Sequence, residues 1–308
     1  MQGKWTLKWI EKVEVPTDCT MQRGSATTVG GVAFFNPGDT NTVYAYENYS
    51  QDWKELPNCP HYSFTLVAVD GLLTAVGGSG QQEQTPGDTL LSFVKGEWME
   101  KFPPMSMQRT SPAAVCTGQC LVVAGGCSGE NENSIPSVEI MNTNTQQWHT
   151  AATNYPLWNC ERIATSVSSS MAACGDNIYA FEGDDRTLSH VYTCSLSSLL
   201  QSCQQSSVHT NGISAIHTWN RLADLPVSQS TPVTLCGRLL SVGGHGDTEV
   251  VDAVYYYEPT TDTWQKMGTL ICPQGLPLAA SLPGDKLVVV HSNNNESFIG
   301  TSIVVEVS

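Results

Sequence analysis

Four stretches of the chain alternate apolar with other residues and then reach a tight turn and a tryptophan. They read TVYAY, TLLSF, SVEIM and AVYYY, and they start at Thr42, Thr89, Ser137 and Ala253. A period of two predicts strands, and the Asn, Asp, Pro, Gly or Thr residues that follow predict hairpin turns. Each stretch is therefore predicted to form one strand of a hairpin, in which the turn leads to a second, antiparallel strand that contains the tryptophan.

In three of these hairpins an apolar residue precedes the tryptophan by the same number of positions. The spacing is seven positions in Tyr46/Trp53, Met141/Trp148 and Tyr257/Trp264, and a shorter version runs from Phe93 to Trp98. The intervals between successive tryptophans are 44, 45, 50, 71 and 45 residues, for Trp9, Trp53, Trp98, Trp148, Trp219 and Trp264. In the long interval, Tyr192 precedes Trp219 by 27 positions, which predicts one loop insertion at about Thr193 to Thr218.

Upstream of three hairpins, a turn glycine is followed by four or more mostly apolar residues and a glycine pair. These segments read GLLTAVGG, GQCLVVAGG and GRLLSVGG, and their pairs are Gly77 with Gly78, Gly125 with Gly126, and Gly243 with Gly244. A short apolar run bounded by turns predicts a strand buried on both faces. Paired glycines suit a place where backbones crowd and no Cβ fits. Weaker copies start at Gly31, Gly175 and Gly284, so six copies are present.

A repeat of 44 to 50 residues with four strands per unit is typical of a β-propeller, whose sheets bury both faces against their neighbours. The glycine pair, the tyrosine and the tryptophan at these offsets resemble the Kelch repeat over almost the whole chain. The residues and this resemblance predict an all-β fold, a six-bladed β-propeller of four-stranded antiparallel blades. Kelch propellers serve as substrate adaptors, scaffolds and, occasionally, enzymes, so the resemblance leaves the function open.

The two ends of the sequence are incomplete units. The last unit ends at SIVVEVS without a tryptophan, whereas the text KWIEKVEVP near the N-terminus reads like a fourth strand. We therefore expect an N-terminal strand at about residues 5–15 to complete the C-terminal blade and close the ring, which leaves no free edge there. Residues 1–308 are predicted to form a single Kelch-type propeller domain.

Composition excludes several classes of partner. The net charge is −15, and the 14 Lys and Arg residues are not gathered into runs, which argues against binding nucleic acid or an anionic membrane. The sequence contains neither an apolar stretch long enough to span a bilayer nor the apolar segment of a signal peptide. We expect a cytoplasmic protein that is monomeric as an isolated domain.

Eleven cysteines lie mostly in strand-like text and lack the paired spacings of a zinc site. We interpret them as buried free thiols and expect neither a metal nor a cofactor. The best candidate for a disulfide, should the compartment be oxidising, is the pair Cys194 and Cys203 within the insertion.

In a propeller, the loops from each second to each third strand share one face with the connections between blades. We call this the loop face and expect it to bind a partner, because loops on a rigid scaffold usually carry function. The insertion falls on the opposite face. The loops after the second strands are acidic, with Asp39, Glu83, Asp88, Glu130, Glu132, Asp184, Asp185, Asp247, Glu249 and Glu296. This rim either favours cationic partners or keeps the protein soluble.

The connections between blades supply the candidate contacts. Kelch adaptors that bind peptides have arginines and serines here, so the resemblance implies partner binding by Arg23, Arg109, Arg162, Ser25 and Ser111. Arginine can bind a carboxylate in a bidentate manner, through two N–H groups. The alternative is that these arginines pair with the acidic loops or cap backbone carbonyls. Aromatic anchors would be Tyr62, Tyr155 and Trp158, although packing between blades is a common fate of such rings.

The sequence offers little for catalysis. His245 and His291 stand beside a glycine pair or its equivalent in adjacent units, but no metal-binding spacing, nucleophile elbow or phosphate loop accompanies them. We therefore predict a non-catalytic interaction module for a protein or peptide ligand, as a substrate-recognition or scaffold domain of a larger protein. The alternative is a small-molecule enzyme that resembles the sugar-acid epimerases of this fold. Convergence of His245, Arg109 and a carboxylate in one pocket would support the enzyme.

Overall fold

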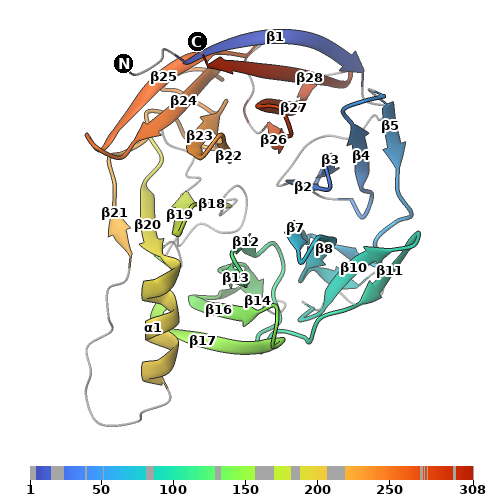
Figure 1. Cartoon of the computed structure of the whole chain (residues 1–308), viewed down its shortest axis with the longest axis vertical. Helices are drawn as coiled ribbons and strands as arrows, with labels where there is room; N and C mark the ends of the chain where they lie inside the picture. The colour runs from blue at the N-terminus through green and yellow to red at the C-terminus, as the bar shows by residue number, and fades with distance from the viewer. Residues whose placement is uncertain are drawn as a thin grey trace.

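The chain forms a propeller of radially arranged antiparallel sheets (Figure 1). The computed structural model describes residues 5–14, 24–38, 40–50, 52–80, 87–128, 133–156, 170–181, 188–206, 219–270, 273, 275, 277–293 and 296–307. For residues 5–14, 133, 205–206, 291–293 and 296–307 it describes the backbone alone. The predicted all-β propeller with four-stranded antiparallel blades is confirmed.

Five blades each contain four strands in chain order from the centre outward. Blade 1 contains β2 (Ser25–Val29), β3 (Val32–Asn36), β4 (Tyr44–Glu47) and β5 (Asp52–Glu55). Blade 2 contains β7 (Thr65–Val69), β8 (Leu72–Val76), β10 (Leu90–Val94) and β11 (Glu97–Glu100). Blade 3 contains β12 (Ala113–Thr117), β13 (Cys120–Ala124), β16 (Ser137–Asn142) and β17 (Gln147–Asn154).

The next two blades follow the same order. Blade 4 contains β18 (Ser170–Cys174), β19 (Asn177–Phe181), β20 (Val191–Ser195) and β21 (Asn220–Arg221). Blade 5 contains β22 (Thr231–Leu235), β23 (Arg238–Val242), β24 (Ala253–Glu258) and β25 (Thr263–Thr269). Two short two-stranded sheets lie in the loops, β6 (His61–Tyr62) with β9 (Ser79–Gly80) and β14 (Cys127–Ser128) with β15 (Asn133–Ser134).

A further four-stranded sheet combines both ends of the described chain. It contains β26 (Leu278–Leu282), β27 (Lys286–Asn293), β28 (Glu296–Val307) and β1 (Trp5–Glu14), and we call it the composite sheet. Strand β1 runs antiparallel to β28 from the pair Trp5/Val307 to the pair Glu14/Ile299, with a shift in register after Trp9. Figure 1 shows these two strands side by side.

Apolar clusters fill the spaces between neighbouring sheets. Blades 1 and 2, 2 and 3, 3 and 4, and 4 and 5 each share one cluster of buried side chains. The composite sheet shares one cluster with blade 1, around Phe35 and Leu278, and another with blade 5, around Leu240 and Val289. Each sheet therefore buries both of its faces, which is why the second strands are mostly apolar.

The spacing of the aromatic residues follows from the hairpins, as predicted. Tyr46 lies directly opposite Trp53, and Tyr257 lies opposite Trp264. Their ring centroids are 5.0 and 5.2 Å apart. A spacing of seven positions places the first residue of such a hairpin opposite its last residue. The tyrosine and the tryptophan therefore pack together on one face of the blade.

The tryptophans also join neighbouring blades. The indole N–H groups of Trp98, Trp148 and Trp264 donate to the carbonyls of Pro57, Pro103 and Ala223, at 2.7, 2.9 and 3.0 Å. Each acceptor lies just after the fourth strand of the preceding blade. The indole N–H groups of Trp53 and Trp219 are buried without a partner in the described part of the chain.

The insertion between β20 and β21, predicted to be a loop, contains a helix. Helix α1 (Leu196–Ser206) packs along β17 of blade 3, with Leu199 buried beside Tyr155 and Ile178 in the shared cluster. The Ser195 hydroxyl accepts a hydrogen bond from the Ser198 N–H at 3.1 Å and so caps the helix. Cys194 and Cys203, the candidate pair for a disulfide in an oxidising compartment, are both free thiols in the structure.

The glycine pairs lie where backbones approach each other, as predicted. Gly78 has a φ of +97°, and a Cβ at this position would lie 2.5 Å from the carbonyl oxygen of Tyr62. A side chain is therefore excluded both by the backbone conformation and by the neighbouring strand.

The second glycines of the other two pairs are restricted in the same way. Gly126 has a φ of +80°, and a Cβ there would lie 2.6 Å from the carbonyl oxygen of Thr110. Gly244 has a φ of +114°, and its Cβ would overlap the carbonyl oxygen of Ser228. In blades 2, 3 and 5, the second glycine of the pair thus lies against the backbone of a connection between blades.

We predict that Gly78→Ala lowers the free energy of unfolding by about 2–3 kcal/mol. The matched control is Gly71→Ala in the same blade, where φ is +72° but no atom lies within 4 Å of the added Cβ. Gly71→Ala should lower the free energy of unfolding by about 1 kcal/mol, because only the positive φ disfavours a side chain there. Urea unfolding of both variants checks this, and equal losses would show that the close approach to Tyr62 has no effect on stability.

Candidate functional site: the loop face

The loop face is held together by backbone hydrogen bonds between segments that are distant in sequence. Gly78 N–H donates to Arg109 O at 2.8 Å, and Arg109 N–H donates to Gly87 O at 2.9 Å. Thr110 and Cys127 exchange two such bonds at 3.0 Å. Connections between blades are thus bonded to the loops after second strands.

The same arrangement recurs on the other side of the propeller. Ser228, in the connection from blade 4 to blade 5, exchanges backbone hydrogen bonds of 2.9 and 2.8 Å with His245 after β23. Ser189 and Leu225 form a similar pair at 3.1 and 3.0 Å. We call this set of bonds the loop lattice. These bonds join backbone atoms and hold the loops in place, whereas the side chains of Arg109, Ser189, Leu225 and Ser228 are themselves buried.

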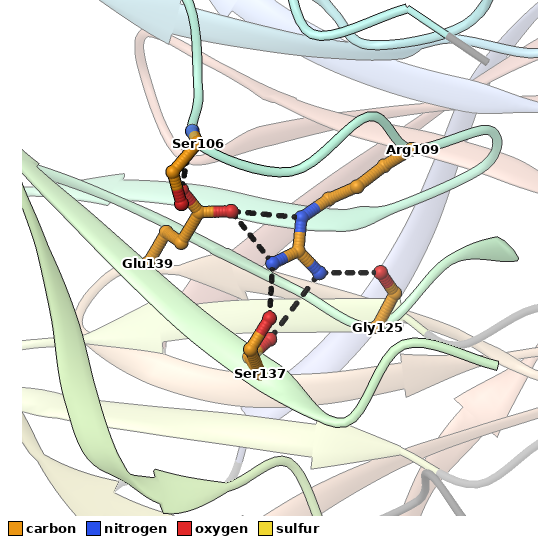
Figure 2. Close-up of polar contacts among 5 residues, drawn as sticks. All are labelled: Ser106, Arg109, Gly125, Ser137 and Glu139. Carbon is orange, nitrogen blue, oxygen red and sulfur yellow. Dashed lines mark hydrogen bonds and ion pairs between the residues drawn. The ribbon is translucent and has the colours of Figure 1, made fainter. Parts of the chain in front are cut away.

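Arg109 lies at the centre of a buried polar cluster (Figure 2). Its Nη2 lies 2.7 Å from Glu139 Oε1, and the two side chains are 0% and 1% exposed. Arg109 Nε also donates to Glu139 Oε1 at 3.2 Å. The remaining N–H groups donate to Gly125 O, Ser137 O and Ser137 Oγ at 2.8, 3.2 and 2.7 Å. All five guanidinium N–H donors are therefore satisfied.

The second carboxylate oxygen of Glu139 is also occupied. It accepts hydrogen bonds from Ser106 N–H and Ser106 Oγ, at 2.7 and 2.6 Å. Burial lowers the pKa of Arg109, and the hydrogen bond and charge of Glu139 oppose that shift. The cluster therefore anchors the connection that contains Ser106 and Arg109 to strand β16 and to the glycine pair of blade 3.

The prediction of Arg109 as a partner contact is wrong for this reason, since no part of its side chain reaches solvent. Instead, as in the alternative given above, Arg109 pairs with a carboxylate and donates hydrogen bonds to backbone carbonyls. The carboxylate comes from the buried strand β16 rather than from an acidic loop. Sequence reasoning missed Glu139, although a charge in the middle of the apolar text SVEIM signals a buried partner.

Two other predicted partner contacts, Tyr155 and Ser25, make contacts within the propeller. Tyr155 is 0% exposed and packs edge-on against Trp219 with centroids 5.9 Å apart, so its assignment as an anchor for a partner is wrong. Ser25 is half-buried, and its hydroxyl accepts a hydrogen bond from Leu66 N–H at 2.9 Å. This bond gives Ser25 a structural role between blades 1 and 2.

Tyr62 and Ser111 lie on the loop face and are partly exposed. Tyr62 belongs to β6, which pairs with β9, and Ser111 donates its N–H to Ser63 O at 2.7 Å, so backbone hydrogen bonds hold both residues in place. Three further predicted contacts, Arg23, Arg162 and Trp158, lie outside the described residues.

The acidic rim is described in part. Asp247 and Glu249 are exposed in the loop after β23, and Asp88 is half-buried in the loop after β9. The backbone carbonyl of Glu249 accepts the N–H of Gly246 at 2.9 Å, which closes that loop. For the remaining predicted rim residues, the side chains are not described: Asp39, Glu83, Glu130, Glu132, Asp184, Asp185 and Glu296.

Sequence reasoning also missed an exposed polar cluster at the margin of the loop face. Asp224 Oδ1 lies 2.9 Å from both His190 Nδ1 and Arg221 Nη2. Burial alone would raise the pKa of Asp224, but hydrogen bonds from Arg221 and His190 hold it below its usual value. The cluster joins the start of β20 to the connection that follows β21, and no sequence motif marks it.

The histidines of the loop face have structural contacts. His61 Nδ1 lies 2.9 Å from Gly77 O. His245 is half-buried, and its ring lies against Gly275. The side chain of His291 is outside the described residues. Within the described part of the chain, no group of three His, Cys, Asp or Glu residues could hold a metal ion. Among the same residues, no helix is long and apolar enough to cross a membrane.

Comparison with protein families finds the Kelch motif in two segments, residues 108–154 and 226–271. These segments contain blades 3 and 5, so the chain carries Kelch motifs where the predicted repeats match best. A solved structure titled "Structure of YjhT" has a TM-score of 0.68 to this chain. It is aligned over 95% of this chain and 99% of that one, at 13% sequence identity. This likeness shows a shared fold.

Two curated proteins are similar over part of the chain. N-acetylneuraminate epimerase of Yersinia enterocolitica is 35% identical over 94 residues, which are 27% of this chain and 24% of that protein. An F-box/kelch-repeat protein of Arabidopsis thaliana is 31% identical over 103 residues, which are 33% of this chain and 26% of that protein. The chain thus spans about a quarter of the length of these relatives.

Proposed function

We propose that the chain is a non-catalytic interaction module that binds a protein or peptide ligand on its loop face. The observation that carries this proposal is the loop lattice, in which backbone hydrogen bonds hold the loop that presents the exposed side chains of Asp247 and Glu249. Rigid loops lose little conformational entropy on binding, which favours affinity. Tyr62, Asp247 and Glu249 are the described side chains best placed for contact.

The proposed ligand is cationic where it meets the loop after β23. Asp247 and Glu249 are exposed there, whereas the charge of Arg109 is buried and neutralised by Glu139. An acidic rim attracts basic segments and raises their rate of association at low ionic strength. Similarity to the F-box/kelch-repeat protein supports a substrate-recognition or scaffold role within a larger protein.

The proposal also includes the finer architecture. We infer that the composite sheet is the sixth blade of a ring closed by β1, which is supported by the antiparallel pairing of β1 with β28. We propose that this ring forms a single domain, acts as a monomer when isolated, and works in the cytoplasm. The free thiols agree with a reducing compartment.

A second candidate function is a small-molecule enzyme acting on a sugar acid. It is favoured by the similarity of part of the chain to N-acetylneuraminate epimerase. Of the groups expected to converge in that case, Arg109 is buried in its own cluster and the ring of His245 lies against Gly275. The binding module therefore has the stronger support.

Affinity capture with the purified chain tests the proposal. We predict that Asp247→Lys/Glu249→Lys reduces the recovery of a specifically bound protein at least about tenfold, because two favourable charges become repulsive. Added salt should weaken binding to the wild type. Thermal unfolding of the variant establishes that the fold is unchanged.

The matched control is Glu97→Lys, an exposed charge reversal in the hairpin between β10 and β11 on the opposite face. It should leave recovery unchanged. Equal losses from both variants would point to net charge rather than to the loop face. Retained binding in Asp247→Lys/Glu249→Lys would contradict the assignment, and turnover of N-acetylneuraminate by the wild type would favour the enzyme.

A further inference from the structure

Three titratable or charged side chains meet at one imidazole nitrogen at the margin of the loop face. His190 Nδ1 lies 2.9 Å from Asp224 Oδ1 and 2.9 Å from Arg221 Nη2. Arg221 Nη2 also donates to Asp224 Oδ1 and Oδ2, at 2.9 and 3.0 Å. The side chains of His190, Asp224 and Arg221 are 40, 32 and 53% exposed, so a proton can reach them from solvent.

Strand pairing places His190 opposite Asp224. Ser189 and Leu225 exchange two backbone hydrogen bonds, and His190 and Asp224 are their neighbours on the side of β20 and β21. In an antiparallel pair, the residues next to a hydrogen-bonded pair lie directly opposite each other with their side chains on one face. The contact between His190 and Asp224 therefore follows from the backbone.

A β-bulge brings Arg221 to the same face. Tyr192 pairs with Arg221. Two positions separate His190 from Tyr192, whereas three separate Asp224 from Arg221, so the second segment contains one extra residue. Residues two apart in a strand share a face, and so do paired residues. Arg221 therefore shares the face of His190 and Asp224, although residues three positions apart in a regular strand point to opposite faces.

The propeller fold does not require charged groups at this place. Blades 1, 2, 3 and 5 contain the backbone hydrogen bond equivalent to the one from Leu225 N–H to Ser189 O. The residues at the positions of His190 and Asp224 are uncharged in all four of these blades: Thr42 and Asn58, Thr89 and Pro104, Ser137 and Asn154, and Ala253 and Thr269. The charged cluster is thus particular to blade 4, which points to a role other than folding.

The two partners of His190 require opposite forms of Nδ1. A guanidinium group only donates hydrogen bonds, so Arg221 can bond Nδ1 only when this atom carries a lone pair. A carboxylate only accepts, so Asp224 can bond Nδ1 only when this atom carries a proton. Burial acts to raise the pKa of Asp224, but hydrogen bonds from Arg221 and His190 hold it below its usual value, so the carboxylate stays charged while the imidazole titrates. The two hydrogen bonds to Nδ1 are therefore mutually exclusive.

We propose that His190 is a proton-operated switch between Arg221 and Asp224. When the imidazole is neutral, its Nδ1 accepts a hydrogen bond from Arg221 Nη2. In acid, one proton is added to Nδ1, the Nδ1–H donates to Asp224 Oδ1, and repulsion between the two cations moves Arg221 away from the ring. Because the charges of Arg221 and Asp224 cancel, the margin of the loop face gains one positive charge in acid. The proposal does not depend on the proposed function.

The elements next to the cluster carry few other charges. Tyr192 shares the face of His190 and packs toward blade 3, where β17 and α1 contain no Asp, Glu, Lys or Arg. Their titratable side chains are His149 and Cys203. From blade 5, Asp262 approaches the connection but already accepts hydrogen bonds from a backbone N–H and a tyrosine hydroxyl. Five charged residues of the adjoining segments lie outside the described residues: Glu161, Arg162, Asp184, Asp185 and Arg186.

Nitrogen NMR of the histidine side chains in the full chain, at about pH 8 and about pH 5, tests the proposal. At the higher pH, the wild type should carry the His190 proton on Nε2 and show a scalar coupling between His190 Nδ1 and Arg221 Nη2 across the hydrogen bond. Arg221→Met should move the proton to Nδ1, where it bonds Asp224, and so change the tautomer ratio at least about tenfold. His190→Gln identifies the signals, and exposed His149 should keep its ratio in every variant.

In acid, the partner of His190 should be Asp224. At about pH 5, the Nδ1 proton of the wild type should exchange with water at least about tenfold more slowly than in Asp224→Ala, and the coupling to Arg221 should be absent. A wild type that carries its proton on Nδ1 at the higher pH would overturn the proposal, because Asp224 would then be the partner throughout. An unchanged tautomer ratio in Arg221→Met, or equal proton exchange in the wild type and Asp224→Ala, would overturn it as well.

Discussion

Arg109→Met should lower the free energy of unfolding by about 3–5 kcal/mol, because it leaves the carboxylate of Glu139 buried without its counter-charge. The carbonyl of Gly125 and the Ser137 side chain lose donors as well. Urea unfolding followed by tryptophan fluorescence measures the loss. Since Arg109 does not reach the surface, the folded fraction should keep its affinity for a loop-face ligand.

Two further variants separate the buried charge from lost packing. Arg109→Met/Glu139→Leu removes both charges and should recover most of the stability that Arg109→Met loses. Lys54→Met removes one partner of an exposed ion pair, Lys54 with Glu47, and should have little effect because solvent screens such pairs. If Arg109→Met were as mild as Lys54→Met, the cluster would not anchor the connection between blades 2 and 3.

Leu7→Pro/Lys8→Pro should destabilise the protein by about 3 kcal/mol or more and promote self-association. These residues pair with Val305 and Val304 of β28. Backbone N–H groups alternate in direction along a strand, so two consecutive prolines remove at least one donor to the ladder. Loss of β1 exposes the edge of β28, and free edges recruit other chains. Urea unfolding and light scattering provide the measurements.

Leu7→Ala/Lys8→Ala is the control, since it changes the same side chains but keeps every backbone donor. It should retain more stability than the proline variant and scatter light like the wild type. If both variants behaved alike, the pairing of β1 with β28 would not contribute to stability. The inference that β1 closes the ring would then be wrong.

Sequence alone predicted those features that depend on neighbours along the chain. The hairpin that places Tyr257 opposite Trp264 is specified by a turn of Pro, Thr and Asp and by alternation on each side. Gly78 was recognisable because a positive φ and a close backbone leave no other residue suitable. These local requirements recur in each unit, and their recurrence predicted the propeller.

The candidate site was harder to predict because burial depends on residues that are distant in sequence. Arg109 and Glu139 are 30 positions apart, and each looks like a surface charge until strand β16 places the carboxylate inside. Helix α1 was missed for a different reason. Its apolar residues Leu196, Leu199 and Cys203 follow helical spacing after a capping serine, but the regular period of the repeat made the segment look like an inserted loop.

The central claim is that a ligand binds the loop face, and amide hydrogen exchange of the chain with and without a captured ligand tests it most directly. The account predicts slower exchange at residues 61–62, 79–80 and 245–250, with no change in the turns at Asp70–Gly71 and Cys236–Gly237 on the opposite face. Protection confined to those turns or to α1, with the loop face unchanged, would contradict it.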